Sequence, residues 1–66
     1  MEITVNGAKK DVAEGMTVGA LVDSLDLAGE TVVVQRNDNI VAREHFGSTT
    51  CAPGDVVEIV RLVGGG

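Results

Sequence analysis

Apolar and polar residues alternate at the start of the chain in a pattern that predicts a β-hairpin. Ile3 and Val5 are separated by a polar residue, as in a strand with one buried face. The Asn6-Gly7 pair that follows readily adopts the left-handed backbone angles of a tight hairpin turn. We therefore expect residues 9–13 to form the returning strand, with Val12 turned inward.

The spacing of apolar residues then changes to that of an α-helix. Thr17 can cap the first turn with its hydroxyl group, and Gly29 lies just beyond the expected end. Gly19 weakens the helix by about 1 kcal/mol relative to alanine, so the helix needs a sheet to pack against. The apolar stripe follows the spacing i, i+3, i+4 and i+7 and consists of Val18, Leu21, Val22 and Leu25.

The rest of the chain predicts three further strands. Residues 31–35 contain three consecutive valines, which suits a central strand, and residues 40–41 form a short strand after a polar turn at 36–39. Residues 56–63 form the last and longest strand. Two smaller features precede it, namely a single helical turn at 43–46 anchored by Phe46 and a turn at Pro53-Gly54-Asp55.

The predicted order of elements is β-β-α-β-β-β. Twelve valines and three isoleucines also favour sheet. We predict an α+β fold in which one helix crosses a mixed sheet of about four to five strands. Residues 1–63 form this single domain, and residues 64–66 form a flexible glycine tail.

Size and charge exclude several classes of function. A chain of 66 residues has little material for the walls of a catalytic cleft. Five Lys and Arg against ten Asp and Glu give a net charge of −5, which disfavours nucleic acids and anionic membranes and favours partners with basic surfaces. No export segment or membrane-length apolar run is visible, so we expect a cytoplasmic protein. A carrier, a binding module or a small subunit fits these limits better than an enzyme.

Two residues with reactive side chains do not form a recognisable site. His45 and Cys51 stand alone in the sequence, whereas a structural zinc site needs four ligands. We expect Cys51 to be a buried, unreactive thiol and His45 to be a surface or capping residue. The sequence predicts no bound metal and no bound cofactor.

The C-terminal end carries the strongest chemical signal. The last predicted strand continues without a turn into Gly64-Gly65-Gly66. Glycines lack a Cβ atom, so such a thread can enter a narrow channel and present the Gly66 carboxylate to another protein's active site. From composition alone, a frayed chain end or a glycine-rich linker is an equal alternative.

The surrounding residues resemble the ubiquitin-like proteins and, more narrowly, the ThiS family of β-grasp sulfur carriers. Two positions depart from the family pattern, because Ala42 stands where proline is frequent and Cys51 where an aliphatic residue is usual. The resemblance covers the whole chain and rests on residues 3–7, 17–18, 21–22, 39–41, 43–44, 53–55, 57–60 and 64–66.

This resemblance implies a carrier whose chemistry is performed by partner enzymes. An E1-like adenylating enzyme of the ThiF type would use ATP and Mg²⁺ to adenylate the Gly66 carboxylate. Sulfur that originates from a cysteine desulfurase would then replace AMP and leave a C-terminal thiocarboxylate. A thiazole synthase of the ThiG type would take this sulfur into the thiazole ring of thiamine. Gly64 and Gly65 would be recognised as the slender tail.

Alternation along the last strand also predicts a partner interface. If Val57 and Ile59 point inward, Val60 and Leu62 face outward, and Val33 shares that face. In ubiquitin-like proteins the matching positions often form the docking patch, and Arg61 leads from it into the tail. The alternative is that these are single exposed aliphatic residues of the kind found on any surface.

Two other functions are compatible with the same sequence. The chain also resembles β-grasp sulfur carriers of other pathways, such as the small subunit of molybdopterin synthase. A ubiquitin-like interaction module whose tail is never activated would belong to a different class.

Overall fold

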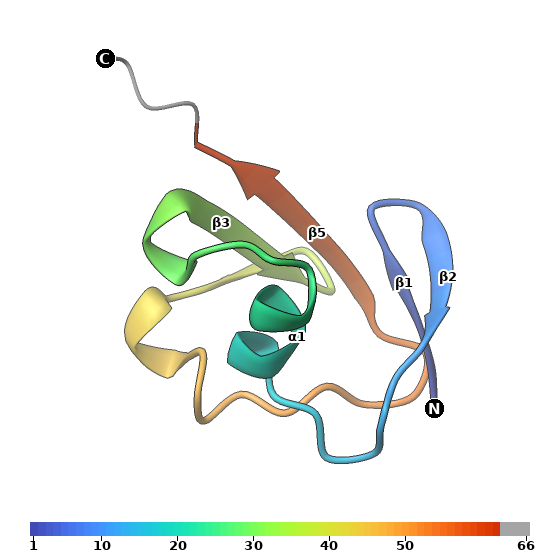
Figure 1. The fold of residues 1–66 in the computed structure, drawn as a ribbon. Helices are drawn as coiled ribbons and strands as arrows, with labels where there is room; N and C mark the ends of the chain where they lie inside the picture. Colours follow the sequence, from blue (N-terminus) through green and yellow to red (C-terminus); the bar gives the residue numbers. More distant parts are fainter. Residues whose placement is uncertain (63–66) are drawn as a thin grey trace.

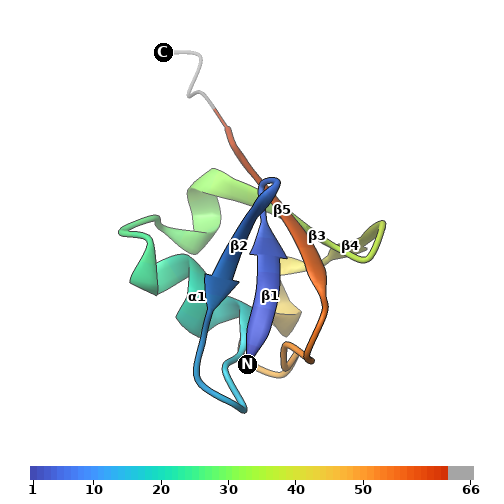
Figure 2. The ribbon, with the colours of Figure 1, turned by 90° about the vertical axis from the view of Figure 1, so that its right-hand side faces the viewer.

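The computed structural model describes residues 1–62, and residues 63–66, which include the predicted tail, lie outside the described part. Five strands form one mixed sheet in the order β2-β1-β5-β3-β4, with the helix α1 on one side (Figures 1 and 2). The elements are β1 (Glu2–Val5), β2 (Ala8–Asp11), α1 (Val18–Ser24), the 3₁₀ turn η1 (Gly29–Thr31), β3 (Val32–Arg36), β4 (Asn39–Val41), the 3₁₀ turn η2 (Arg43–His45) and β5 (Val56–Arg61).

The first hairpin forms where the sequence predicts it. Asn6 and Gly7 have φ angles of 50° and 82°, which the reversal from β1 into β2 requires. The returning strand is Ala8–Asp11 and not 9–13, because the two-residue turn lets pairing begin at once with Val5 opposite Ala8. Val12 follows the strand and is buried, as predicted.

The helix begins as predicted and ends earlier. The Thr17 hydroxyl oxygen accepts a hydrogen bond from the Ala20 N–H at 3.1 Å and caps the first turn. The helix ends at Ser24, and the left-handed residue beyond it is Asp26, with a φ angle of 59°. The prediction that Gly29 marks the end was therefore wrong, and Gly29 instead begins η1.

The second hairpin is tighter than the sequence suggested. The predicted four-residue turn at 36–39 contracts to Asn37-Asp38, whose φ angles are 50° and 70°. The flanking residues Arg36 and Asn39 pair across β3 and β4. As a result Arg36 belongs to β3 and Asn39 belongs to β4, and neither residue lies in the turn.

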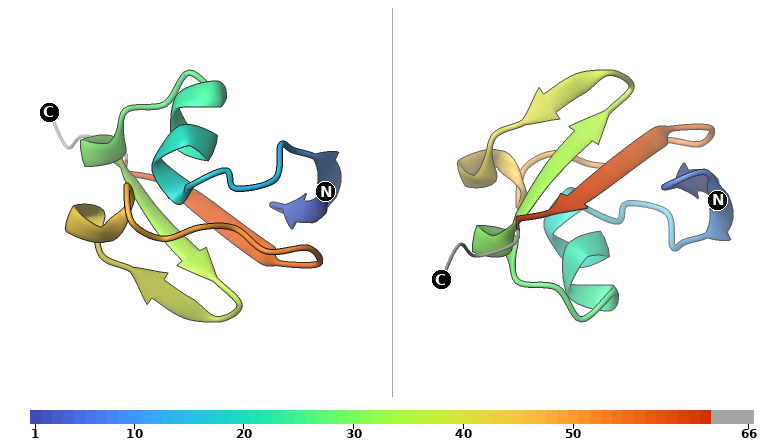
Figure 3. Two further views of the ribbon diagram at one scale, coloured as in Figure 1. Left: turned by 90° about the horizontal axis from the view of Figure 1, so that it is seen from below. Right: turned by 90° about the horizontal axis from the view of Figure 1, so that it is seen from above.

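The core lies between the sheet and α1. Figure 3 shows α1 on one side of the strands, while no helix or strand among residues 1–62 covers the opposite side of β3, β4 and β5. No helix among residues 1–62 is long and apolar enough to cross a membrane. The buried apolar side chains are Ile3, Val5, Val12, Val18, Leu21, Val22, Val32, Val34, Phe46, Cys51, Val57 and Ile59.

Candidate docking site

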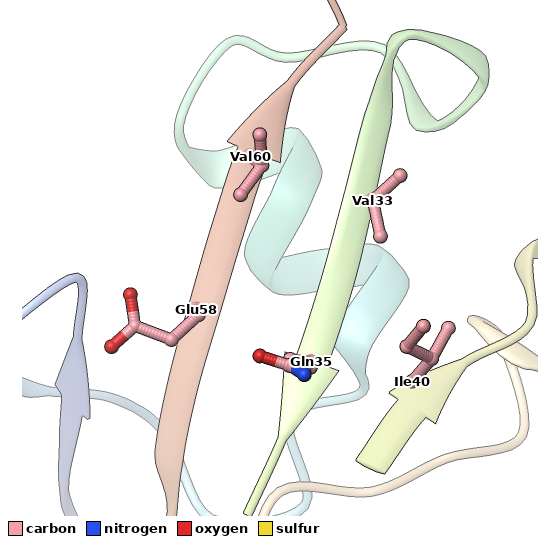
Figure 4. A pocket seen from close by; sticks show the side chains of 5 residues that line it. All are labelled: Val33, Gln35, Ile40, Glu58 and Val60. Carbon is pink, nitrogen blue, oxygen red and sulfur yellow. The ribbon is translucent and has the colours of Figure 1, made fainter. Parts of the chain in front are cut away.

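An apolar hollow lies on the sheet face opposite α1. The antiparallel register places Val33 beside Val60 and Gln35 beside Glu58, while Ile40 of β4 lies across from Gln35. These five side chains line an open hollow of about 310 Å³ (Figure 4). Three strands that are distant in the sequence therefore build one surface.

The hollow contains part of the interface that the sequence predicted. Val33 is 37% exposed and Val60 is 59% exposed, although both are valines in strands of the sheet. Leu62, which is 52% exposed, lines a neighbouring hollow of about 270 Å³ that also includes Val33. The structure thus brings Val33, Val60 and Leu62 onto one continuous face.

Arg61 takes a different position from its two neighbours. Val57, Ile59 and Arg61 form one alternate row along β5, so the Arg61 side chain leaves the opposite side of the strand from Val60. Arg61 is exposed at the strand end. Arg61 can therefore contact a partner at the end of β5, but it does not line either of the two hollows.

Three residues of the hollow were missed from the sequence. Ile40 is 70% exposed, and Gln35 and Glu58 form a polar cross-strand pair at one end of the hollow. A two-residue turn at Asn37-Asp38 would have placed Ile40 opposite Gln35 and revealed its contribution. The longer predicted turn concealed this register.

The side chain of Asn6, which is 53 positions from Ile59 in the sequence, forms hydrogen bonds to the middle of β5. The Asn6 Nδ2 donates to the Ile59 carbonyl oxygen at 3.2 Å, and the Asn6 Oδ1 accepts from the Ile59 N–H at 2.7 Å. The Asn6 carboxamide thus makes the two hydrogen bonds to β5 that a further peptide group of β1 would make. It does so because β1 ends at Val5, where the chain turns into the hairpin. On the other side of β5, the Leu62 N–H donates to the Thr31 carbonyl oxygen at 2.7 Å. The strand that leads toward residue 66 is therefore held up to Leu62.

A buried carboxylate anchors the beginning of the same strand. Asp55 accepts hydrogen bonds from Arg36 Nε at 2.6 Å, from the Ala52 N–H at 2.8 Å and from Asn37 Nδ2 at 3.0 Å. Burial alone raises the pKa of Asp55, but these hydrogen bonds and the Arg36 charge outweigh it and hold the pKa below its ordinary value. Sequence reasoning treated Asp55 only as a turn residue.

Cys51 and His45 occupy the positions that the sequence indicated. Cys51 is 4% exposed, and His45 is exposed at the end of η2. Burial raises the pKa of the Cys51 thiol, the Asp55 carboxylate raises it further, and Arg36 opposes them. Among residues 1–62, no three His, Cys, Asp or Glu side chains gather as a metal site would require.

The predicted covalent site is outside the described residues. Gly64, Gly65 and Gly66 fall in the part of the chain beyond Leu62, so their roles stay predictions. The described part contributes an exposed apolar face and a well-held strand immediately before them. This arrangement suits docking onto another protein.

Comparisons with known proteins identify similar chains of the same size. A family model described as the ThiS family matches residues 1–66. The chain is 38% identical over 58 residues to the sulfur carrier protein ThiS of Bacillus subtilis, covering 88% of this chain and 83% of that protein. It also matches the crystal structure of the thiamine biosynthesis protein (ThiS) from Geobacter metallireducens with a TM-score of 0.85 and 40% identity, and the match covers 100% of both chains. The predicted β-grasp fold is confirmed by this match.

Longer relatives contain a similar segment. A thiazole synthase of Paramagnetospirillum magneticum is 35% identical over 66 residues, which is 100% of this chain and 20% of that protein. The chain likewise spans 20% of a thiazole synthase of Magnetococcus marinus.

Proposed function

The chain belongs to the ThiS family, and we propose that it is a sulfur carrier of thiamine biosynthesis that is loaded at its C-terminal carboxyl group. The observation that carries this proposal is the exposed apolar face around Val33, Val60 and Leu62, which we call the docking face, at the end of the chain segment that precedes the glycine run in the sequence. Val60 lies near the end of β5 and Leu62 directly follows this strand, two positions before Gly64-Gly65-Gly66 in the sequence. A partner that binds this face is therefore within reach of the glycine tail.

The chemistry takes place on the Gly66 carboxylate. A carboxylate is a poor electrophile, so an E1-like adenylating enzyme of the ThiF type first joins it to AMP, using ATP and Mg²⁺ and releasing pyrophosphate. A persulfide supplied through a cysteine desulfurase attacks the acyl carbon and displaces AMP. A thiol then cleaves the sulfur–sulfur bond and leaves a thiocarboxylate on Gly66.

The loaded carrier then delivers its sulfur to a second enzyme. A thiazole synthase of the ThiG type takes sulfur from the thiocarboxylate into the thiazole ring and regenerates the carboxylate. The carrier itself needs no bound cofactor in this scheme, because each chemical step occurs in a partner's active site. Gly64 and Gly65 supply reach and a small cross-section.

Intact-mass measurement tests this function. The protein is incubated with a ThiF-type enzyme, ATP, Mg²⁺, a cysteine desulfurase, cysteine and a thiol. We expect the mass to increase by the difference between sulfur and oxygen, and we expect pyrophosphate to be released. Gly65→Ala should fail both tests, because an added methyl group would clash with the walls of a narrow channel.

Other results would assign a different function. No mass change and no pyrophosphate release from the unaltered protein would indicate an interaction module. A thiocarboxylate that a ThiG-type synthase cannot use would indicate a sulfur carrier of another pathway.

A further inference from the structure

The docking face has an apolar part and a charged end. Val33, Ile40 and Val60 supply the apolar part of the hollow, and Glu58 is the only charged residue that lines it within residues 1–62. Figure 4 shows the Glu58 carboxylate directed away from Val33, toward the side of β5 that faces β1. The charge therefore lies at the rim and not in the centre of the hollow.

The Glu58 carboxylate takes part in no ion pair among the described residues. The ion pairs within residues 1–62 join Met1 to Asp11, Lys9 to Glu2 and Arg36 to Asp55. Asp55, which directly precedes β5, is buried and accepts three hydrogen bonds, whereas Glu58 is exposed. Glu58 thus presents its charge to whatever binds the face.

We propose that Glu58 selects partners that carry a lysine or arginine beside an apolar side chain. The proposal rests on the function proposed above and takes the adenylating enzyme as the occupant. The apolar side chain of the enzyme enters the hollow over Val33 and Val60. Its cation lies over Glu58, about 7 Å along β5, because two residues of a strand rise roughly 3.3 Å each.

Position at the rim determines what this charge contributes. A rim charge stays partly hydrated, so it adds less to the lifetime of a complex than to the rate and orientation of encounter. The chain has a net charge of −5, so part of any attraction to a basic enzyme is general and not specific to one residue. The experiment must separate the Glu58 carboxylate from this general attraction.

A pair of variants with equal net charge makes that separation. Glu58→Gln and Glu14→Gln each remove one negative charge, and Glu14 is exposed in the loop between β2 and α1. Association with a ThiF-type enzyme is followed by stopped-flow at low and at high salt. We expect Glu58→Gln to lower the association rate constant about three- to tenfold at low salt, more than Glu14→Gln does.

Salt and charge reversal complete the test. The difference between the two variants should shrink at roughly 1 M salt, where charges are screened beyond about 3 Å. Glu58→Lys should associate still more slowly than Glu58→Gln. Equal rates for Glu58→Gln and Glu14→Gln would overturn the proposal, even if the unaltered protein is adenylated normally. Absence of adenylation in the unaltered protein would instead overturn the proposed function.

Discussion

Replacement of Asp55 by asparagine should destabilise the protein through the loss of one buried charge. The Asp55 carboxylate is 5% exposed and accepts three hydrogen bonds, from Arg36, Asn37 and Ala52. Asparagine keeps one acceptor oxygen of similar shape and places an NH₂ group where donors now point. The Arg36 guanidinium would lose the anion that faces it.

The expected cost can be worked from these contacts. A hydrogen bond to a charged group contributes about 1.5–3 kcal/mol, and removal of one partner from a buried ion pair costs about 3–5 kcal/mol. The Arg36 side chain is 30% exposed, so water can recover part of its hydration, and asparagine retains one acceptor. We therefore expect a loss of about 2 kcal/mol at pH 7, which lies within the range for a charged hydrogen bond and below the range for a fully buried ion pair. A domain of 66 residues has a total stability of roughly 3–10 kcal/mol, so this loss is large.

The pH dependence identifies the charge as the cause. The pKa of Asp55 is lowered in the folded protein, so its contribution is fully present above the unfolded-state value of about 3.9. This contribution disappears as the pH falls through the still lower pKa of the folded state. The stability difference between the unaltered protein and Asp55→Asn should therefore shrink in acid.

Urea unfolding followed by far-UV circular dichroism measures this difference, because the chain has no Trp or Tyr to serve as a fluorescent probe. Asp23→Asn, which alters an exposed acid on α1, is the matched control and should change stability by less than about 0.5 kcal/mol. A stability difference between the unaltered protein and Asp55→Asn that is the same at pH 7 and in strong acid would refute the reasoning.

Three further predictions concern the docking face, the centre of β5 and the thiol. Val60→Asp should weaken binding to the adenylating enzyme by about tenfold or more with an unchanged circular dichroism spectrum, since it places a charge in the apolar hollow; binding of undiminished affinity would contradict the assignment of the face. Asn6→Ala should destabilise the protein by about 2 kcal/mol and accelerate hydrogen exchange of the Ile59 amide, because it removes two hydrogen bonds and places alanine at a φ of 50°. Asn6→Asp keeps the acceptor for that amide and should retain most of its protection in exchange measured by NMR; equal exchange rates in the two variants would show that the side-chain acceptor is unimportant. Cys51 should react with iodoacetamide far more slowly in the folded protein than in urea, because burial raises the pKa of its thiol, and rapid labelling of the folded protein would contradict the assignment of Cys51 as an unreactive thiol.

Much of the local structure was accessible from short stretches of sequence. The Asn6-Gly7 turn, the Thr17 cap and the outward position of Val60 depend on residues a few positions apart, and all three are present in the structure. The predicted end of the helix was less accurate, because two residues after it, Asp26 and Gly29, could each adopt the left-handed conformation that ends a helix. The helix ends before Asp26, although a left-handed glycine at position 29 was the stronger signal in the sequence.

The parts of the site that sequence reasoning missed depend on pairing between distant segments. Asp55 meets Arg36 across 19 positions, and Asn6 meets Ile59 across 53. Ile40 joins the hollow only because β3 lies between β4 and β5. The correct turn could have placed Ile40 opposite Gln35 within the β3–β4 hairpin. Neither periodicity nor turn propensity contains the strand order, so no local pattern could identify the contacts of β3 with β5 or the two long-range hydrogen-bonded pairs.

The sequence by itself determined the kinds of elements, the apolar faces and the chemical group proposed for modification, since the glycines of residues 64–66 lie outside the described structure. These properties follow from side-chain chemistry and from periods of two or 3.6 residues. Only the tertiary structure decided that β5 lies in the centre of the sheet, between β1 and β3. That placement brings Glu58 and Val60 beside Gln35 and Val33, because cross-strand neighbours are set by the order and register of strands and not by distance along the chain.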